Sequence, residues 1–203
     1  MDKKIILGMA LCLSVSSAAF ASPLDDYDMG KFSIDLGTSI SPDMDVNGHS
    51  LDGKSRINGG VTAGLGSNWA LQFRYADNKS DAFRGNNYNL KAQEYNALYR
   101  VNPNFSIFAG LVNARVERGN YDDSQKGFQV GLLGQMDFTD RFNGWASVAA
   151  GDTSNAYEIG LGYGLTEMVD LNLFYRYAKY DDFDGSVDDV TTKGLNAGVT
   201  VRF

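Results

Sequence analysis

The feature that most constrains this chain is an alternation of apolar and polar side chains, repeated in segments from residue 31 to the C-terminus. In the first segment Phe32, Ile34 and Leu36 alternate with Ser33 and Asp35. Successive side chains of a β-strand point to opposite faces, so each segment predicts a strand with one apolar face. No helical period appears beyond the N-terminal segment. The pattern therefore predicts an all-β protein.

Ten segments of this kind can be counted. They cover residues 31–40, 56–65, 69–76, 94–101, 105–117, 128–138, 142–151, 157–165, 171–178 and 194–203. The alternation is broken by Phe108 and Val112 in the fifth segment and by Trp145 in the seventh, where a β-bulge is one explanation. We therefore expect ten strands, and eight if these two segments are misread.

The connections between the segments alternate in length. Tight turns at 66–68, 102–104, 139–141 and 166–168 alternate with long connections at 42–53, 77–88 and 180–190, a medium one at 119–125 and a short exception at 152–155. The prolines, Pro23, Pro42 and Pro103, all fall outside the segments, as the missing N–H of proline would require. Tight turns at one end and longer loops at the other are typical of an outer-membrane barrel. An even number of strands places both termini at the tight-turn end.

The N-terminus has the organisation of a secretory signal. Lys3 and Lys4 precede an apolar stretch, and residues 19–21 have the small-x-small pattern of a signal-peptidase site. We interpret residues 1–21 as a cleaved signal peptide and residues 22–203 as a single barrel domain. The only cysteine lies inside this signal, so the mature chain is expected to have no disulfide and no thiolate metal site.

Alternation alone does not distinguish a membrane barrel, which is apolar outside, from a soluble barrel, which is apolar inside. The polar face combines charges with many glycines, and this suits a crowded lumen, because glycine on a solvent face weakens a strand without a packing return. Aromatic residues also gather in two bands, which is typical of the girdles at the two bilayer interfaces. One band is Trp69, Tyr99, Phe105, Phe138, Phe142 and Phe203, and the other is Tyr75, Phe128, Tyr157 and Tyr177. Both features favour a membrane barrel.

The last segment ends on an aromatic residue, with Leu195, Val199, Val201 and Phe203 on one face. This ending resembles the C-terminal β-signal of bacterial outer-membrane proteins, and the mature chain as a whole resembles the small porin-like, OmpA-type transmembrane barrels. The resemblance implies a closed antiparallel up-and-down barrel, integral to the outer membrane of a Gram-negative-type cell envelope. It implies contact with outer-membrane lipid and lipopolysaccharide, and recognition of the strand ending in Phe203 by the outer-membrane assembly machinery. Barrels of that type usually have eight strands, whereas ten are counted here.

The predicted inward face carries charges that are candidates to line a lumen: Arg74, Glu94, Arg100, Glu158 and Arg176. Unpaired buried charges are costly, so these side chains either pair and plug the barrel or line a narrow constriction that water reaches. Eight strands leave an interior that side chains fill, whereas porins with an aqueous channel have ~16 or more. We therefore expect a small porin-like protein with at most a narrow or gated pore for small solutes. The alternative is a non-conducting structural or surface-interaction barrel.

Enzymatic activity on outer-leaflet lipid is the weakest alternative. His49, the only histidine, lies beside Ser50 in the first long connection, but nothing around it matches a catalytic constellation. We expect no catalytic residue, no cofactor and no metal. The net charge of −7 argues against nucleic acid as a partner, because phosphate binding needs clustered Lys and Arg. The sequence leaves the oligomeric state open.

Overall fold

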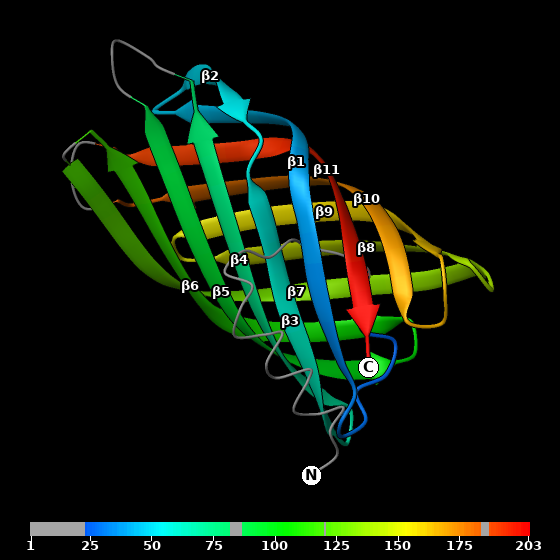
Figure 1. Cartoon of the computed structure of the whole chain (residues 1–203). Helices are drawn as coiled ribbons and strands as arrows, with labels where there is room; N and C mark the ends of the chain where they lie inside the picture. The colour runs from blue at the N-terminus through cyan, green and yellow to red at the C-terminus, as the bar shows by residue number, and fades with distance from the viewer. Residues whose placement is uncertain (1–22, 82–86, 120, 184–186) are drawn as a thin grey trace, which may run out of the picture.

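The computed structural model describes residues 23–81, 87–119, 121–183 and 187–203, so the predicted signal peptide lies outside the described residues (Figure 1). These ranges contain no helix long and apolar enough to cross a membrane. They form eleven strands. The strands are β1 (Phe32–Val46), β2 (His49–Lys54), β3 (Ile57–Gly66), β4 (Trp69–Ser80), β5 (Tyr88–Asn102), β6 (Phe105–Arg118), β7 (Tyr121–Thr139), β8 (Phe142–Gly151), β9 (Ser154–Gly164), β10 (Val169–Asp181) and β11 (Asp189–Arg202).

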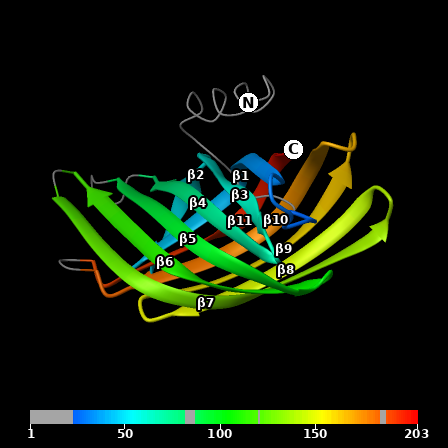
Figure 2. The same cartoon turned by 90° about the horizontal axis from the view of Figure 1, so that it is seen from below.

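Ten of the strands close an antiparallel barrel, which Figure 2 shows from below. From β3 to β11 each strand pairs with the next, and β1 pairs with both β3 and β11 to complete the ring. The predicted ten-stranded closed barrel is confirmed, and the eight-stranded alternative is wrong. The remaining strand, β2, lies outside the ring, where it forms a hairpin with the far end of β1 and a short ladder with β4.

The two segments with imperfect alternation are the strands β6 and β8. Phe108 and Val112 do lie on the inward face of β6, where the lumen itself is apolar. Trp145 is buried on the inward face of β8, and the ladders of β8 have no irregularity at its position. The bulge suggested for Trp145 is therefore wrong. These side chains interrupt the sequence pattern because parts of the lumen are filled with apolar groups.

Pro42 lies inside β1, which corrects the expectation that every proline falls outside a strand. The β1–β11 register shifts between Ser39 and Ser41, immediately before this proline. On the other side of β1, the ladder with β3 ends at Thr38 and the ladder with β2 begins at Asp43. Across this gap β1 has a strand partner on one side only, so the missing N–H of proline is tolerated.

The strands continue into two connections that the sequence predicts to be irregular. The segment 42–53 is largely taken up by the end of β1 and by β2, and the segment 119–125 is mostly the start of β7. At this end of the barrel the strands therefore form much of the rim themselves. The rim opposite the tight turns is a folded extension of the barrel wall.

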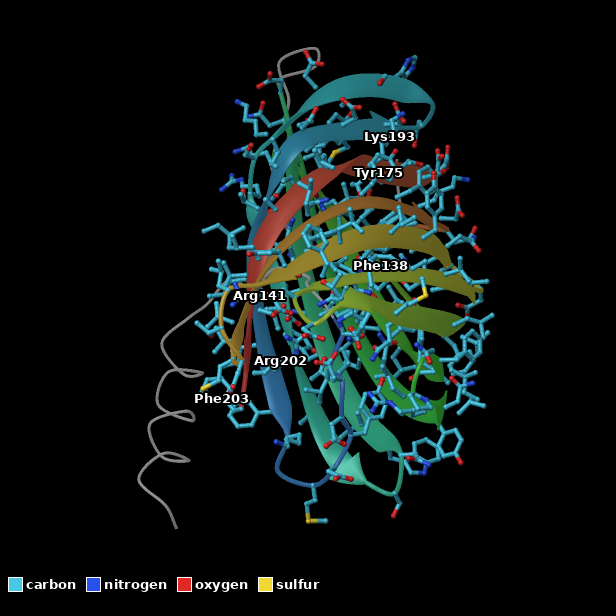
Figure 3. All side chains as sticks on the ribbon, turned by 90° about the vertical axis from the view of Figure 1, so that its right-hand side faces the viewer. Phe138, Arg141, Tyr175, Lys193, Arg202 and Phe203 are labelled. Atoms are coloured by element: carbon cyan, nitrogen blue, oxygen red, sulfur yellow. The ribbon has the colours of Figure 1, made fainter. Side chains whose placement is uncertain are left out.

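The apolar face of the strands points outward, as predicted for a membrane barrel. Large exposed apolar side chains include Leu71, Leu111, Val130, Leu132, Ile159, Leu161 and Leu173. Aromatic pairs lie on this surface near both ends: the ring centroids of Trp69 and Tyr99 are 5.0 Å apart, and those of Tyr157 and Tyr177 are 4.8 Å apart. Figure 3 shows Phe203 near the tight-turn end, and Lys193 beyond Tyr175 toward the opposite rim.

Candidate functional site

Four charged side chains from four strands meet inside the barrel, and we name them the charged layer. They are Arg74 of β4, Glu94 of β5, Glu158 of β9 and Arg176 of β10. Arg74 faces Glu94 in the register of β4 and β5, and Glu158 faces Arg176 in the register of β9 and β10. Each side chain lies on the inward face of its strand and is at most 9% exposed. Strand alternation therefore places all four in the lumen.

Two of the three ion pairs in the charged layer cross the lumen. Arg74 Nη2 lies 2.6 Å from Glu158 Oε2, and Arg176 Nη2 lies 2.5 Å from Glu94 Oε1. A third pair, 3.2 Å between Arg176 Nη1 and Glu158 Oε2, joins neighbouring strands and links the two crossing pairs. The layer contains two charges of each sign, so the buried charges compensate one another.

Neutral side chains complete the hydrogen bonds of this layer. Trp145 Nε1 donates to Glu158 Oε1 at 2.9 Å, and Gln129 Nε2, which donates to Asn96 Oδ1 at 2.8 Å, lies 3.5 Å from Glu94 Oε2. Gly160 faces Trp145 in the β8–β9 register, and a Cβ there would lie 2.3 Å from the indole ring. Sequence reasoning missed Trp145 as part of the site. The signal that could have found it is a large inward side chain opposite a glycine, which leaves room for the ring.

Two small cavities lie inside the barrel beside the charged layer, and a larger hollow of about 440 Å³ opens at the tight-turn mouth. A cavity of about 30 Å³ on the tight-turn side is lined by residues including Pro23, Arg74 and Trp145. A cavity of about 20 Å³ on the other side is lined by residues including Arg176 and Tyr180. Because a water molecule requires roughly 10–15 Å³, the first cavity has room for about two or three waters and the second for about one or two. The charged layer separates them.

Beyond the charged layer, toward the long-loop rim, the lumen is packed with apolar side chains. The buried members of this apolar plug are Met44, Val46, Leu51, Ala76, Leu90, Ala92, Val112, Ala114, Val116, Ala178, Phe183, Val187 and Val190. They come from most of the strands around the ring, from β2, and from the β10–β11 connection. The outer half of the lumen is thus largely apolar, with a minority of buried polar side chains such as Ser80, Thr191 and Thr192.

Residues 23–30, which we name the N-terminal segment, fill part of the tight-turn mouth beside this hollow. Leu24 and Tyr27 are buried, and Gly66 N donates to Tyr27 O at 2.8 Å. Arg202 Nε of the last strand lies 3.2 Å from Asp25 Oδ2. Burial raises the pKa of the Tyr27 phenol, so this side chain is neutral inside the mouth. The first described residues therefore connect to the last strand of the barrel.

Arg100 belongs to this mouth and not to the charged layer. Its Nη2 donates to Leu24 O at 2.7 Å, and its guanidinium lies 4.0 Å from the centroid of the Tyr27 ring. The structure thus brings four of the five sequence-predicted lumen charges together and places the fifth against the N-terminal segment. His49 begins β2, where it is exposed and faces Val46 of β1. In the described ranges no group of three or more His, Cys, Asp or Glu residues is arranged to hold a metal.

Comparison with known proteins supports the architecture. Residues 8–203 match the protein family described as outer membrane protein beta-barrel domain. No curated protein sequence matches the chain. Among solved structures, the chain is similar to Neisserial surface protein A, with 19% identity, a TM-score of 0.54, and 86% of this chain and 99% of that chain covered. It is also similar to the outer membrane protease OmpT from Escherichia coli, with 11% identity, a TM-score of 0.56, and 86% and 97% covered. These likenesses show a shared fold.

Proposed function

The chain belongs to the outer membrane protein beta-barrel family, and from this premise we propose that it is a closed barrel that presents a folded rim at the cell surface. In this proposal it does not conduct solutes. Its outward apolar face contacts outer-membrane lipid, and the assembly machinery recognises the last strand, which ends near Phe203. Its role is structural or surface interaction.

The observation that carries the proposal is the charged layer. Two of the three ion pairs cross the lumen, none is longer than 3.2 Å, and each cavity beside them has room for no more than about three waters. Opening a path would leave buried charges without partners, which typically costs about 3–5 kcal/mol for each broken pair. The apolar plug obstructs the lumen on one side of this layer, and the N-terminal segment fills part of it on the other. These features favour the non-conducting alternative over a narrow or gated pore.

The rim supports the surface-interaction part of the proposal. On the outer face of β5–β7, Lys91 Nζ lies 2.8 Å from Glu117 Oε1, and Arg115 Nη2 lies 2.5 Å from Asp122 Oδ2. These charged side chains replace the apolar residues of the same face, so this part of the wall suits water or lipid headgroups. From Tyr121 to the aromatic band at Phe128, β7 extends by roughly 24 Å. A rim of this length is accessible to other molecules at the surface.

Conductance in a planar bilayer tests the proposal. We expect the refolded mature protein, residues 22–203, to insert without producing discrete current steps. A sixteen-stranded porin in the same bilayers serves as the positive control, because its lumen holds an aqueous channel. Insertion is checked independently by the altered gel mobility of the folded barrel extracted from the same vesicles. Steady single-channel steps from the wild-type protein would establish a pore and overturn the proposal.

A further inference from the structure

The β6–β7 hairpin extends beyond the neighbouring β8–β9 hairpin (Figure 1). The β6–β7 ladder continues to the pair Arg118–Tyr121, whereas the β7–β8 ladder stops at the pair Gln129–Gly151. Within the ranges that the structure describes, no strand pairs with this edge of β7 from Tyr121 to its end at residue 128. We name this opening the notch. It is bounded by the free edge of β7 and by the β8–β9 turn, residues 152–153.

The backbone groups that face the notch follow from the unbroken register. Phe128 N donates to Asp152 Oδ1 at 2.8 Å, and Asp152 N donates to Phe128 O at 3.3 Å, so both backbone groups of Phe128 point toward the β8 side. Along a strand in an antiparallel sheet, successive residues direct these groups to opposite sides. Asp122, Ser124 and Lys126 therefore direct their N–H and C=O groups into the notch. An edge of this kind is a template for another strand.

Buried polar atoms beside the notch lack hydrogen-bond partners. Gln125 is 5% exposed, and its Nε2 donates to Thr153 O at 3.3 Å. Its Oε1 has no partner among the described residues, and neither have Thr153 Oγ1 and Ser154 Oγ. Almost all buried polar atoms in proteins are hydrogen-bonded, so such a group indicates a bound water or ligand that supplies the missing bond.

The charges around the notch indicate which ligand would fit. Asp181 N donates to Thr153 O at 2.9 Å, which places the end of β10 and the adjacent Asp182 beside the turn. Asp123 on β7 and Asp152 in the turn add two further carboxylates. The described cations nearby are Lys126 on β7, Arg115, which lies 2.5 Å from Asp122, and Lys179, which lies 2.6 Å from Asp181. The surplus of acid favours a basic ligand.

We propose that the notch binds an extended polypeptide segment with Lys or Arg side chains, which adds to the free edge of β7 as an antiparallel strand. Backbone hydrogen bonds to Asp122, Ser124 and Lys126 would supply affinity, and the surrounding carboxylates would select basic side chains. At ~3.4 Å per residue, five or six residues span the edge. This inference rests on the proposed surface-interaction role and names its partner class. It does not depend on whether the barrel conducts.

Amide hydrogen exchange tests the pairing directly. The probe is a blocked peptide of alternating Lys and Val, six residues long, added to the refolded protein in detergent micelles. In the free protein the amides of Ser124 and Lys126 should exchange rapidly and that of Gln125 slowly, because Gln125 bonds to β6. The peptide should slow exchange at Ser124 and Lys126 by about tenfold or more. Binding of the peptide without this alternating protection would overturn the proposal.

Two matched controls separate strand addition from attraction of charge. A peptide of the same sequence with N-methylated backbone amides keeps its charge but loses donors, so it should bind at least about tenfold more weakly. Ser124→Pro removes an N–H that faces the notch and spares the β6 ladder, so the variant should fold and lose peptide binding. Equal binding by either control would overturn the proposal. A dimer of the protein would also overturn the proposal if Ser124 were protected in it without peptide and if Ser124→Pro dissociated it. A second copy of the chain would then occupy the edge. Conductance is measured separately, so a failure of either proposal can be recognised.

Discussion

At the scale of single residues, Glu158 is the side chain on which the charged layer depends. It accepts hydrogen bonds from Arg74, Arg176 and Trp145. Glu158→Ala would leave the charge of Arg74 buried without this partner, so we expect the free energy of unfolding to fall by about 3–5 kcal/mol. Urea unfolding of the refolded barrel in micelles, followed by loss of the folded gel mobility, measures this change.

Glu117→Ala is the matched control for this prediction. Glu117 Oε1 also forms ion pairs, at 2.8 Å with Lys91 Nζ and 3.9 Å with Arg115 Nε, but these side chains are about one-third to one-half exposed on the rim. Exposed ion pairs contribute about 0–1 kcal/mol, so this variant should remain close to wild type. If the two variants unfolded at the same urea concentration, the charged layer would not have the structural role assigned to it.

The strand alternation was sufficient to place Arg74, Glu94, Glu158 and Arg176 inside the barrel, but not to pair them. Two of their ion pairs cross the lumen, and a crossing contact depends on the closure and diameter of the ring. Arg100 has the same position in the alternation as a lumen residue, yet its partners come from the N-terminal segment. That segment has no period-two pattern, so nothing in the sequence linked it to Arg100.

At the scale of elements, the inside and outside of β7 are distinguished by two adjacent residues. Leu132 is 44% exposed on the outer face, whereas Gly131 faces the lumen, where a Cβ would lie 2.2 Å from Phe108 Cζ. Leu132→Arg places a charge against lipid and should cost roughly 2–4 kcal/mol if the position lies near the bilayer midplane. Unfolding in lipid vesicles measures the cost, with Leu132→Ile as the control of similar volume. A Leu132→Arg variant as stable as the control would contradict the orientation of this strand.

Strand existence was predictable from the sequence, whereas strand ends were not. Ten segments correspond to the ten strands of the ring, because each carries a lipid face that must remain apolar. The missed parts, which include β2 and the far ends of β1, β5, β7 and β11, lie where the outer face turns polar and the pattern disappears. Pro42 was misplaced for a related reason: the gap between the β3 and β2 ladders that tolerates it depends on the position of β2.

We expect that the N-terminal segment can undock from the mouth while the barrel stays folded. Tyr27 is 2% exposed and stacks under Arg100, so Tyr27→Ala should cost about 3–5 kcal/mol of docking. The undocked population would rise by more than about 100-fold, and trypsin should cleave after Lys31 correspondingly faster. Met29→Ala is the control, because Met29 is 83% exposed. Equal cleavage of the two variants, with folded gel mobility retained in both, would contradict a docked segment.

At the scale of the whole molecule, the lumen is closed three times in series. The N-terminal segment fills part of the tight-turn mouth, the charged layer crosses the centre, and the apolar plug packs the outer half. Each closure uses a different interaction: a cation–π and hydrogen-bonded mouth, compensated buried charges, and hydrophobic packing. Conditions that weaken one kind of interaction therefore leave the lumen obstructed by the other two. A gated pore would require all three to open together.

Serial closure makes a prediction about conductance that single substitutions can test. Tyr27→Ala removes a closure at the mouth, and Arg74→Ala breaks an ion pair of the charged layer, yet the apolar plug remains in both variants. We expect both to insert in planar bilayers and to stay silent, like the wild type. The combined variant should also stay silent, because Phe183, Val187 and Val190 still pack in the outer half. Current steps in Arg74→Ala alone would show that the charged layer is the only barrier to ions. The protein would then be a narrow pore.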